Sequence, residues 1–249
     1  MVFYKEVFDT RGALYNKAMA LCPNAREAER SLLIDDLAPI PGDLVVDAPA
    51  GGGYVAEALH GMGAQVICLE PSQQFAAAIA QRFTTHITDI HQMPLANGSV
   101  DKIASLTGLH HLPPEQLKQF FSESRRVLKA GGRLAVADVM SDTPVARFLN
   151  GFVDRHTETG HEGTFFTPTT LRSLISNAGF THVNEAHRIF SWVFPDHGTM
   201  LRFFQSLFGL VKASTDQIEQ VVYDELGVIC HSDFIEVHWS LLYAHGDVG

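Results

Sequence analysis

An acidic residue followed by a glycine-rich turn is the part of this chain best suited to bind a ligand. Asp47 follows the aliphatic run 44–46, and three glycines at 51–53 precede a helix-like segment at 54–60. Glycines let the backbone approach a ligand closely, and the start of a helix presents free N–H groups to it. A turn of this kind between a strand and a helix predicts a site for a nucleotide-like ligand.

The glycine pattern alone leaves two ligands open. Residues 51–56 satisfy the G-x-G-x-x-A pattern of dinucleotide-binding turns, and Glu70 would then hold a ribose. However, Asp47, Glu70 and Asp89 are each expected at the end of a strand, which would place three carboxylates along one edge of the sheet. Such an edge favours a ligand with hydroxyls, an amine and a cationic centre, and it repels a polyphosphate. An NAD-dependent oxidoreductase is therefore the less favoured interpretation.

Two adjacent histidines, His110 and His111, follow the fourth expected strand at the mouth of the same pocket. A histidine there could accept a proton from a substrate hydroxyl, so both are candidate catalytic residues. The alternative is that one faces the next helix and the other only caps the loop. His156, His161 and Glu162 lie in a polar loop that could contact substrate or remain solvated. Their spacing matches no metal-binding motif, so no metal site is predicted.

The elements that must position these residues alternate between strands and helices. Strands are expected at 44–48, 65–69, 85–90, 102–106 and 133–139, with helices at 54–60, 72–83 and 114–128. This alternation predicts a doubly wound, mostly parallel sheet. After Met140 we expect a long strand at 183–194, helices at 199–210 and 215–226, and a final strand at 234–243.

The fold class expected from this pattern is α/β. It is a Rossmann-like, mostly parallel sheet of seven strands, with N-terminal helices and a helical insertion between the last two strands. We expect a single domain over residues 1–249. Its parts are an N-terminal helical lead-in (1–41), a cofactor-binding core (42–140), and a substrate-side cap with the sheet edge (141–249).

Composition excludes several classes of protein. The net charge is −10, from 18 basic and 28 acidic residues, and no cluster of Lys and Arg is visible, so a nucleic-acid partner is not expected. The three cysteines are scattered and suggest no disulfide framework. We find no signal peptide and no apolar run long enough to span a bilayer, so we expect a cytoplasmic protein without a membrane partner.

An ordered set of motifs over residues 15–139 resembles a known family. The motifs are Val45-Val46-Asp47-x-x-x-Gly51-x-Gly53, Glu70-Pro71-Ser72, Asp89-Ile90-His91-x-Met93-Pro94-Leu95, Ser99-Val100-Asp101, Leu109-His110-His111-Leu112, and Arg126-Val127-Leu128-Lys129-x-Gly131-Gly132-Arg133-Leu134. Together they resemble the class I S-adenosylmethionine-dependent methyltransferases, in the small-molecule, ubiquinone-biosynthesis-like branch of methyltransferase type 11. The set is much more specific than any one of its motifs.

The resemblance implies methyl transfer from S-adenosylmethionine to a small, partly apolar molecule. Oxygen is the first choice for the acceptor atom, and nitrogen, carbon and sulfur remain open. The implied partner is a small-molecule substrate, and the implied state is a monomer or homodimer. The cofactor-binding residues that the resemblance implies are Tyr15, Asp47, Ala48, Gly51, Gly53, Glu70, Pro71, Asp89, Ile90, Thr107 and Gly108.

The implied roles differ along the cofactor. The loop 47–53 would wrap the methionine part, Glu70 would hold both ribose hydroxyls, and Asp89 would accept from the adenine amino group while Ile90 packs on the ring. Thr107 and Gly108 would lie beside the sulfonium and its methyl group, and Tyr15 would close the site from the N-terminal helix.

One residue departs from the family pattern. Pro49 stands where the family usually has glycine, and proline removes a backbone N–H and fixes φ. The alternative function is therefore a non-catalytic or repurposed S-adenosylmethionine-binding protein.

Overall fold

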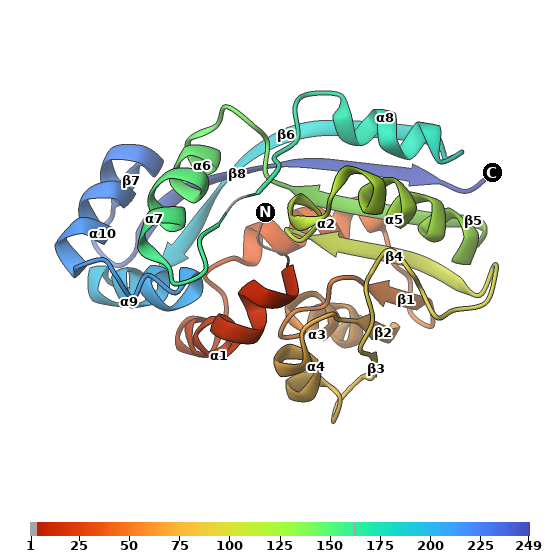
Figure 1. The fold of residues 1–249 in the computed structure, drawn as a ribbon, viewed down its shortest axis with the longest axis horizontal. Helices are drawn as coiled ribbons and strands as arrows, with labels where there is room; N and C mark the ends of the chain where they lie inside the picture. Colours follow the sequence, from red (N-terminus) through yellow and green to blue (C-terminus); the bar gives the residue numbers. More distant parts are fainter. Residues whose placement is uncertain (1–3, 162) are drawn as a thin grey trace.

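One mostly parallel sheet runs through the molecule and carries the strand ends that form the site (Figure 1). The strand order is β3-β2-β1-β4-β5-β8-β6, and β7 pairs with β8 outside this path, which gives eight strands among the residues that the structure describes. The structure is a computed structural model that describes residues 4–161 and 163–249. Among these residues, no helix combines the length and the apolar character needed to cross a membrane.

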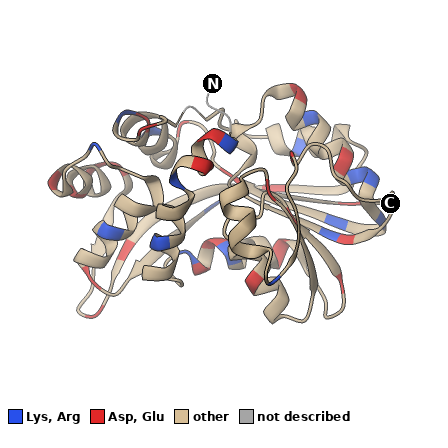
Figure 2. Ribbon diagram, turned by 60° about the horizontal axis from the view of Figure 1, so that its bottom comes forward, with Lys and Arg blue, Asp and Glu red and all other residues tan. Residues whose placement is uncertain are grey.

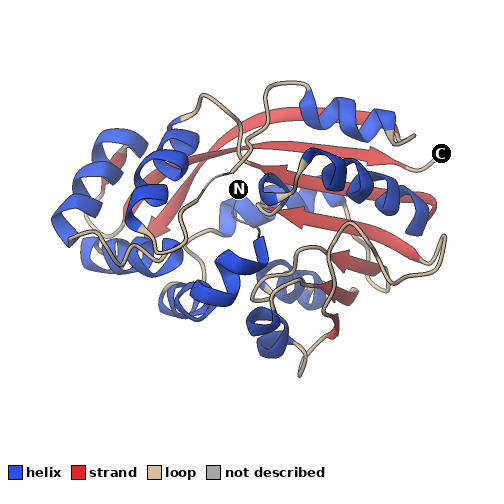
Figure 3. Ribbon diagram, viewed as in Figure 1, coloured by secondary structure: helices blue, strands red, loops and turns tan. Residues whose placement is uncertain are grey.

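The strands and helices alternate as Figure 3 shows. The strands are β1 Leu44–Asp47, β2 Gln65–Leu69, β3 Thr84–His86, β4 Val100–Leu106, β5 Leu128–Asp138, β6 Thr181–Phe194, β7 Val228–Cys230 and β8 Ile235–Asp247. The α-helices are α1 Tyr4–Leu21, α2 Glu27–Leu37, α3 Tyr54–Gly61, α4 Gln73–Ile79, α5 Pro114–Val127, α6 Pro144–Arg147, α7 Asp154–His156, α8 Thr170–Asn177, α9 His197–Phe208 and α10 Thr215–Val221. A 3₁₀ turn η1 covers Leu109–His111, and π-helical turns cover η2 Phe148–Val153 and η3 Val222–Leu226.

The central strand β1 is buried on both faces of the sheet. Val45 and Val46 point to opposite faces because side chains alternate along a strand, and each lies in a different hydrophobic core. Helices α2 and α3 cover the face that holds Val45, and α5 and α8 cover the other face. Burial on both faces explains why β1 is a continuous aliphatic run rather than an alternating one.

The carboxyl-terminal third of the chain turns the sheet antiparallel at one edge. β8 pairs antiparallel with both β5 and β6. The predicted helical insertion between the last two long strands is present as α9, α10 and η3. Figure 1 shows α9 and α10 beside α6 and α7, at the end of β6 and β8 opposite to the C-terminus.

The long helix α1 connects the sheet core to this insertion. It packs against α4 on one side and α9 on the other (Figure 1). The Ser72 hydroxyl donates to Asp9 Oδ1 at 2.8 Å, and Arg11 Nη1 donates to the carbonyl of Phe208 at 3.1 Å. Helix α1 is therefore tied to both regions by its side chains.

The structure corrects three details of the sequence-based expectation. Within residues 4–161 and 163–249 the sheet has eight strands rather than seven, because the three-residue strand β7 pairs with β8. β3 ends at His86 rather than near Ile90, because a turn follows in which the Gln92 N–H donates to the Asp89 carbonyl at 3.0 Å. Asp89 therefore lies in a turn beyond the strand end. Strand β5 begins at Leu128 rather than at residue 133, because Leu128 pairs with Val100 of β4.

Candidate cofactor and substrate site

A cavity lies where β1, β4 and β5 end, beneath helix α1. The space inside it measures about 840 Å³ with its open mouth included. Its strand-end wall contains Pro49, Gly51, Thr107 and Val139. Helix α1 contributes Tyr4, Phe8, Arg11 and Tyr15, and the far wall contains Leu149, Trp192, Leu207, Phe208 and Trp239.

The glycine-rich turn has the backbone that a ligand cradle requires. Gly51 and Gly53 have φ values of +52° and +86°, a region that favours glycine. A Cβ at Gly51 would meet nothing within 4 Å, so space is open beside this residue. A Cβ at Gly52 would lie 2.3 Å from Asn16 Oδ1, which shows how closely helix α1 approaches the turn.

Pro49 lies between the glycine-rich turn and the end of strand β4. Its ring packs on Gly108, where a Cβ would lie 2.3 Å from Pro49 Cγ. The Ala48–Pro49 peptide bond is cis. Thr107 has a φ of +51°, which is strained for a residue with a Cβ, and such strain is frequent at functional sites. The departure from the family glycine is therefore accommodated by a glycine on the neighbouring strand end.

Asp47 is buried behind the turn and is not among the residues that line the cavity. Its Oδ2 accepts the Ala56 N–H at 3.0 Å at the start of α3, where a carboxylate is favourable. Burial raises the pKa of this carboxyl to about 8. Its Oδ1 is buried and has no hydrogen-bond partner among the described residues, so one acceptor remains for a ligand donor.

Glu70 is fully buried and already accepts three hydrogen bonds. The donors are the N–H groups of Gly51 at 2.7 Å and Ser72 at 2.8 Å, and the Tyr4 hydroxyl at 3.1 Å. Burial raises the pKa of Glu70 to about 7, against the lowering effect of these bonds. The Tyr4 hydroxyl therefore uses an oxygen of Glu70 that a ribose hydroxyl could donate to. A ribose that binds this oxygen has to displace the Tyr4 hydroxyl.

The other residues expected to bind the cofactor divide into two groups. Tyr15, Gly51 and Thr107 line the cavity, together with His110 and His111. The remaining expected residues do not line it: Asp47, Ala48, Gly53, Glu70, Pro71, Asp89, Ile90 and Gly108. Asp89 is exposed and Ile90 is buried in a hydrophobic core, because β3 ends before them.

The two candidate catalytic histidines lie in η1, directly after β4, and both are buried in the cavity wall. His110 Nδ1 lies 2.5 Å from Asp138 Oδ1. The same oxygen accepts the Val139 N–H at 2.7 Å, and the other oxygen accepts the Leu109 N–H at 2.8 Å. These backbone donors hold the Asp138 carboxylate in place, and its contact with Nδ1 fixes the His110 ring with Nε2 directed away from the carboxylate.

Sequence reasoning did not identify Tyr4, Arg11 and Asp138 as residues of the site. Asp138 had a usable signal, since it ends the buried run of β5 just as Asp47 ends β1. Tyr4 and Arg11 had none, because only the packing of helix α1 brings them to the cavity. The Arg11 guanidinium is buried, and its Nε has no hydrogen-bond partner among the described residues. Burial lowers the pKa of Arg11 to about 10.

Comparisons with known proteins identify relatives of this chain. The family described as a methyltransferase domain matches residues 46–136. An uncharacterized methyltransferase of Synechocystis sp. is 31% identical over 182 residues, covering 70% of this chain and 83% of the relative. A demethylmenaquinone methyltransferase of Beutenbergia cavernae is 29% identical over 164 residues and covers 64% of each chain.

Solved structures share the fold. An S-adenosylmethionine-dependent methyltransferase of Thermotoga maritima superimposes with a TM-score of 0.66 at 16% identity, covering 98% of this chain and 99% of that one. The cofactor also fits the residues present, since the turn offers open space beside Gly51 and Asp47 keeps an unpaired buried oxygen. The chain therefore belongs to the class I S-adenosylmethionine-dependent methyltransferases and is an enzyme that uses this cofactor.

Proposed function

We propose that the enzyme methylates a hydroxyl oxygen of a small, partly apolar molecule bound in this cavity. The observation that carries the proposal is the division of the cavity wall. Aromatic and aliphatic side chains form its far side, whereas His110 and His111 meet Thr107 at the strand-end side. An apolar body with one polar group fits such a wall.

The names of two relatives support a small substrate. One relative is the demethylmenaquinone methyltransferase already described, and another is an arsenite methyltransferase of Halobacterium salinarum, 26% identical over 157 residues. Charge also argues against a nucleic-acid substrate. Figure 2 shows Lys and Arg scattered over several elements beside Asp and Glu, and the net charge is −10.

The chain's residues have separable roles in this proposal. When bound, the cofactor supplies a methyl group on a positively charged sulfur. The turn at 47–53 and Glu70 hold the cofactor, and residues 141–249 supply the apolar far wall. His110, held by Asp138, can accept the hydroxyl proton at Nε2. Because methyl transfer is a displacement in line, alignment of the oxygen by these walls contributes most of the acceleration.

A screen that reports release of S-adenosylhomocysteine tests the proposal. Apolar phenols and alcohols are compared with amines and thiols of the same carbon skeleton, and NMR of the product locates the new methyl group. We expect turnover with hydroxyl compounds and an O-methyl product. Turnover confined to amines or thiols, or a product methylated on carbon, would contradict the assignment of oxygen as acceptor.

The histidines are tested separately. His111→Phe keeps an aromatic ring but removes the polar nitrogens. We expect it to lower kcat for the best hydroxyl substrate at least tenfold while S-adenosylmethionine still binds. Unchanged kcat would show that His111 only packs beside the site.

A further inference from the structure

Three buried histidines from two segments meet in the cavity wall. His110 and His111 come from η1, and His161 comes from the loop after α7. One ring nitrogen from each lies within 4.8 Å of those from the other two. The three side chains are nearly inaccessible to solvent, with exposed fractions of 5%, 3% and 3%. Burying three imidazoles together is costly unless their polar atoms have partners.

Their ring nitrogens are not all satisfied by the protein. His110 Nε2 and His111 Nδ1 are buried without a hydrogen-bond partner among the described residues. His161 Nδ1 lies 3.4 Å from Asn150 Oδ1, which leaves its Nε2 for another partner. Buried polar atoms without protein partners in a native fold need an explanation, and a bound ion is one that fits ring nitrogens.

The surroundings hold the rings in place for such a ligand. A metal-binding histidine almost always donates its other N–H to a carboxylate or carbonyl oxygen, and His110 has this arrangement with Asp138. The backbone N–H of His161 donates to Asp154 Oδ1 at 2.7 Å, which ties His161 to helix α7. Gly163, in the same loop as His161, also packs on His110, since a Cβ there would lie 2.9 Å from His110 Cδ2.

We propose that His110, His111 and His161 bind a divalent transition-metal ion, and that Zn²⁺ is the ion this ligand set fits best. Three imidazoles with a fourth position left open are typical of catalytic zinc. Mg²⁺ and Ca²⁺ prefer oxygen ligands, so this cluster does not suit them. Bonds of about 2.0–2.1 Å in a tetrahedral site place the nitrogens roughly 3.3 Å apart, so the rings close inward by about 1.5 Å or less.

The open position would face the substrate cavity, because all three histidines line it beside Thr107. The Arg11 guanidinium lines the same cavity and favours an anionic fourth ligand. This role rests on the proposed function. A substrate hydroxyl at the metal would release its proton to solvent, and an oxygen electron pair would form the new bond to the methyl carbon. The sulfur–methyl bond would break with its pair on sulfur, and the ion would take over the activation otherwise given to His110 Nε2.

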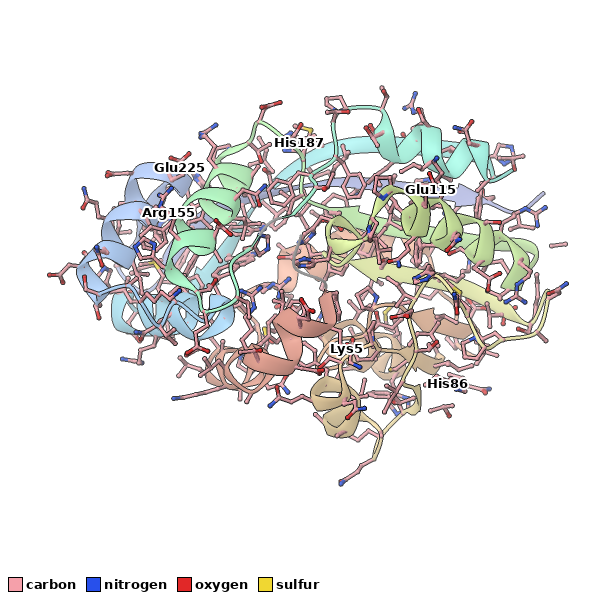
Figure 4. The ribbon with its side chains drawn as sticks, viewed as in Figure 1. Lys5, His86, Glu115, Arg155, His187 and Glu225 are labelled. Atoms are coloured by element: carbon pink, nitrogen blue, oxygen red, sulfur yellow. The ribbon has the colours of Figure 1, made fainter. Side chains whose placement is uncertain are left out.

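Metal titration tests the site without any substrate. Full-length protein freed of metal with a chelator is titrated with Zn²⁺ by calorimetry and with Co²⁺ by visible absorption. We expect one ion per chain and the absorption of tetrahedral Co²⁺. We expect His161→Ala to lower Zn²⁺ affinity at least 100-fold and Asp138→Asn to lower it 10- to 100-fold. The matched control is His187→Ala, since His187 is an exposed residue of β6 (Figure 4). This variant should bind Zn²⁺ as the wild type does.

The outcomes separate this proposal from the proposed function. Absence of stoichiometric Zn²⁺ binding by the wild type overturns the metal site, and so does wild-type affinity in His161→Ala. Circular dichroism establishes whether each variant is folded. If His161→Ala does not fold, His110→Ala replaces it in the titration. S-adenosylmethionine is titrated into the metal-free protein in parallel. Cofactor binding and O-methylation that proceed unchanged in the metal-free enzyme would remove the ion's catalytic role while the proposed function stands.

Discussion

Replacing Tyr4 with phenylalanine should strengthen the binding of S-adenosylmethionine. The Tyr4 hydroxyl donates to Glu70 Oε2 at 3.1 Å and so occupies an acceptor that a ribose hydroxyl needs. Tyr4→Phe removes this competitor and keeps the aromatic ring. The ring can still pack on Phe8, from which it is separated by 4.5 Å between centroids.

The expected size of the effect follows from the bond that is lost. A hydrogen bond to a charged group contributes about 1.5–3 kcal/mol, and the low end applies because the pKa of Glu70 is about 7, so the carboxyl is only partly ionised at neutral pH. A penalty of about 1.5 kcal/mol that the cofactor no longer has to overcome corresponds to roughly tenfold tighter binding.

Calorimetric titration of both proteins with S-adenosylmethionine at pH 7.5 measures this difference. Tyr223→Phe is the matched control, because its hydroxyl lies 3.5 Å from Cys230 Sγ and outside the cavity. The control should bind like the wild type. Weaker binding by Tyr4→Phe would refute the reasoning, because it would mean that the Tyr4 hydroxyl helps to hold the cofactor instead of competing with it.

Three further predictions concern the turn and its acids. Asp47→Ala and Glu70→Ala should each weaken S-adenosylmethionine binding at least tenfold, about 1.4 kcal/mol, in calorimetry, and unchanged affinity in both would show that the site is misplaced. The pKa of Glu70 is raised from 4.5 to about 7, so its contribution to stability is complete below about pH 4.5 and is lost as pH rises through 7. Glu70→Gln should therefore gain stability relative to the wild type in urea denaturation at pH 8 but not at pH 4.5, and an equal difference at both would contradict the raised pKa. Gly108→Ala should cost about 1–3 kcal/mol of unfolding free energy because its Cβ would collide with the Pro49 ring, whereas Gly61→Ala has open space and should cost little.

The core of the fold was predictable because its signals are local. The aliphatic run before Asp47 forms β1, the glycines form the turn, and α3 begins at Tyr54 as expected. Each depends on a few adjacent residues whose burial or backbone conformation admits only certain side chains. The confirmed methyltransferase family depends on the same segments.

The parts that were missed depend on contacts between distant residues. β7 has three residues and exists as a strand only through its pairing with β8. Tyr4 and Glu70 are 66 positions apart, and Arg11 and Phe208 are 197 apart. No periodicity within a segment encodes such contacts, because they arise when α1 packs against two regions that fold from different parts of the chain.

The two attachments of α1 have a thermodynamic consequence. Its Tyr4 side chain donates to Glu70, and its Arg11 side chain donates to the carbonyl of Phe208 in α9. A ligand that displaces Tyr4 therefore acts on the same rigid element that carries Arg11 and Phe8 along the substrate wall. In the proposed function, we therefore expect the binding of cofactor and of substrate to be linked through this helix. Linkage is reciprocal, so the factor by which one ligand changes the affinity for the other is the same in both directions.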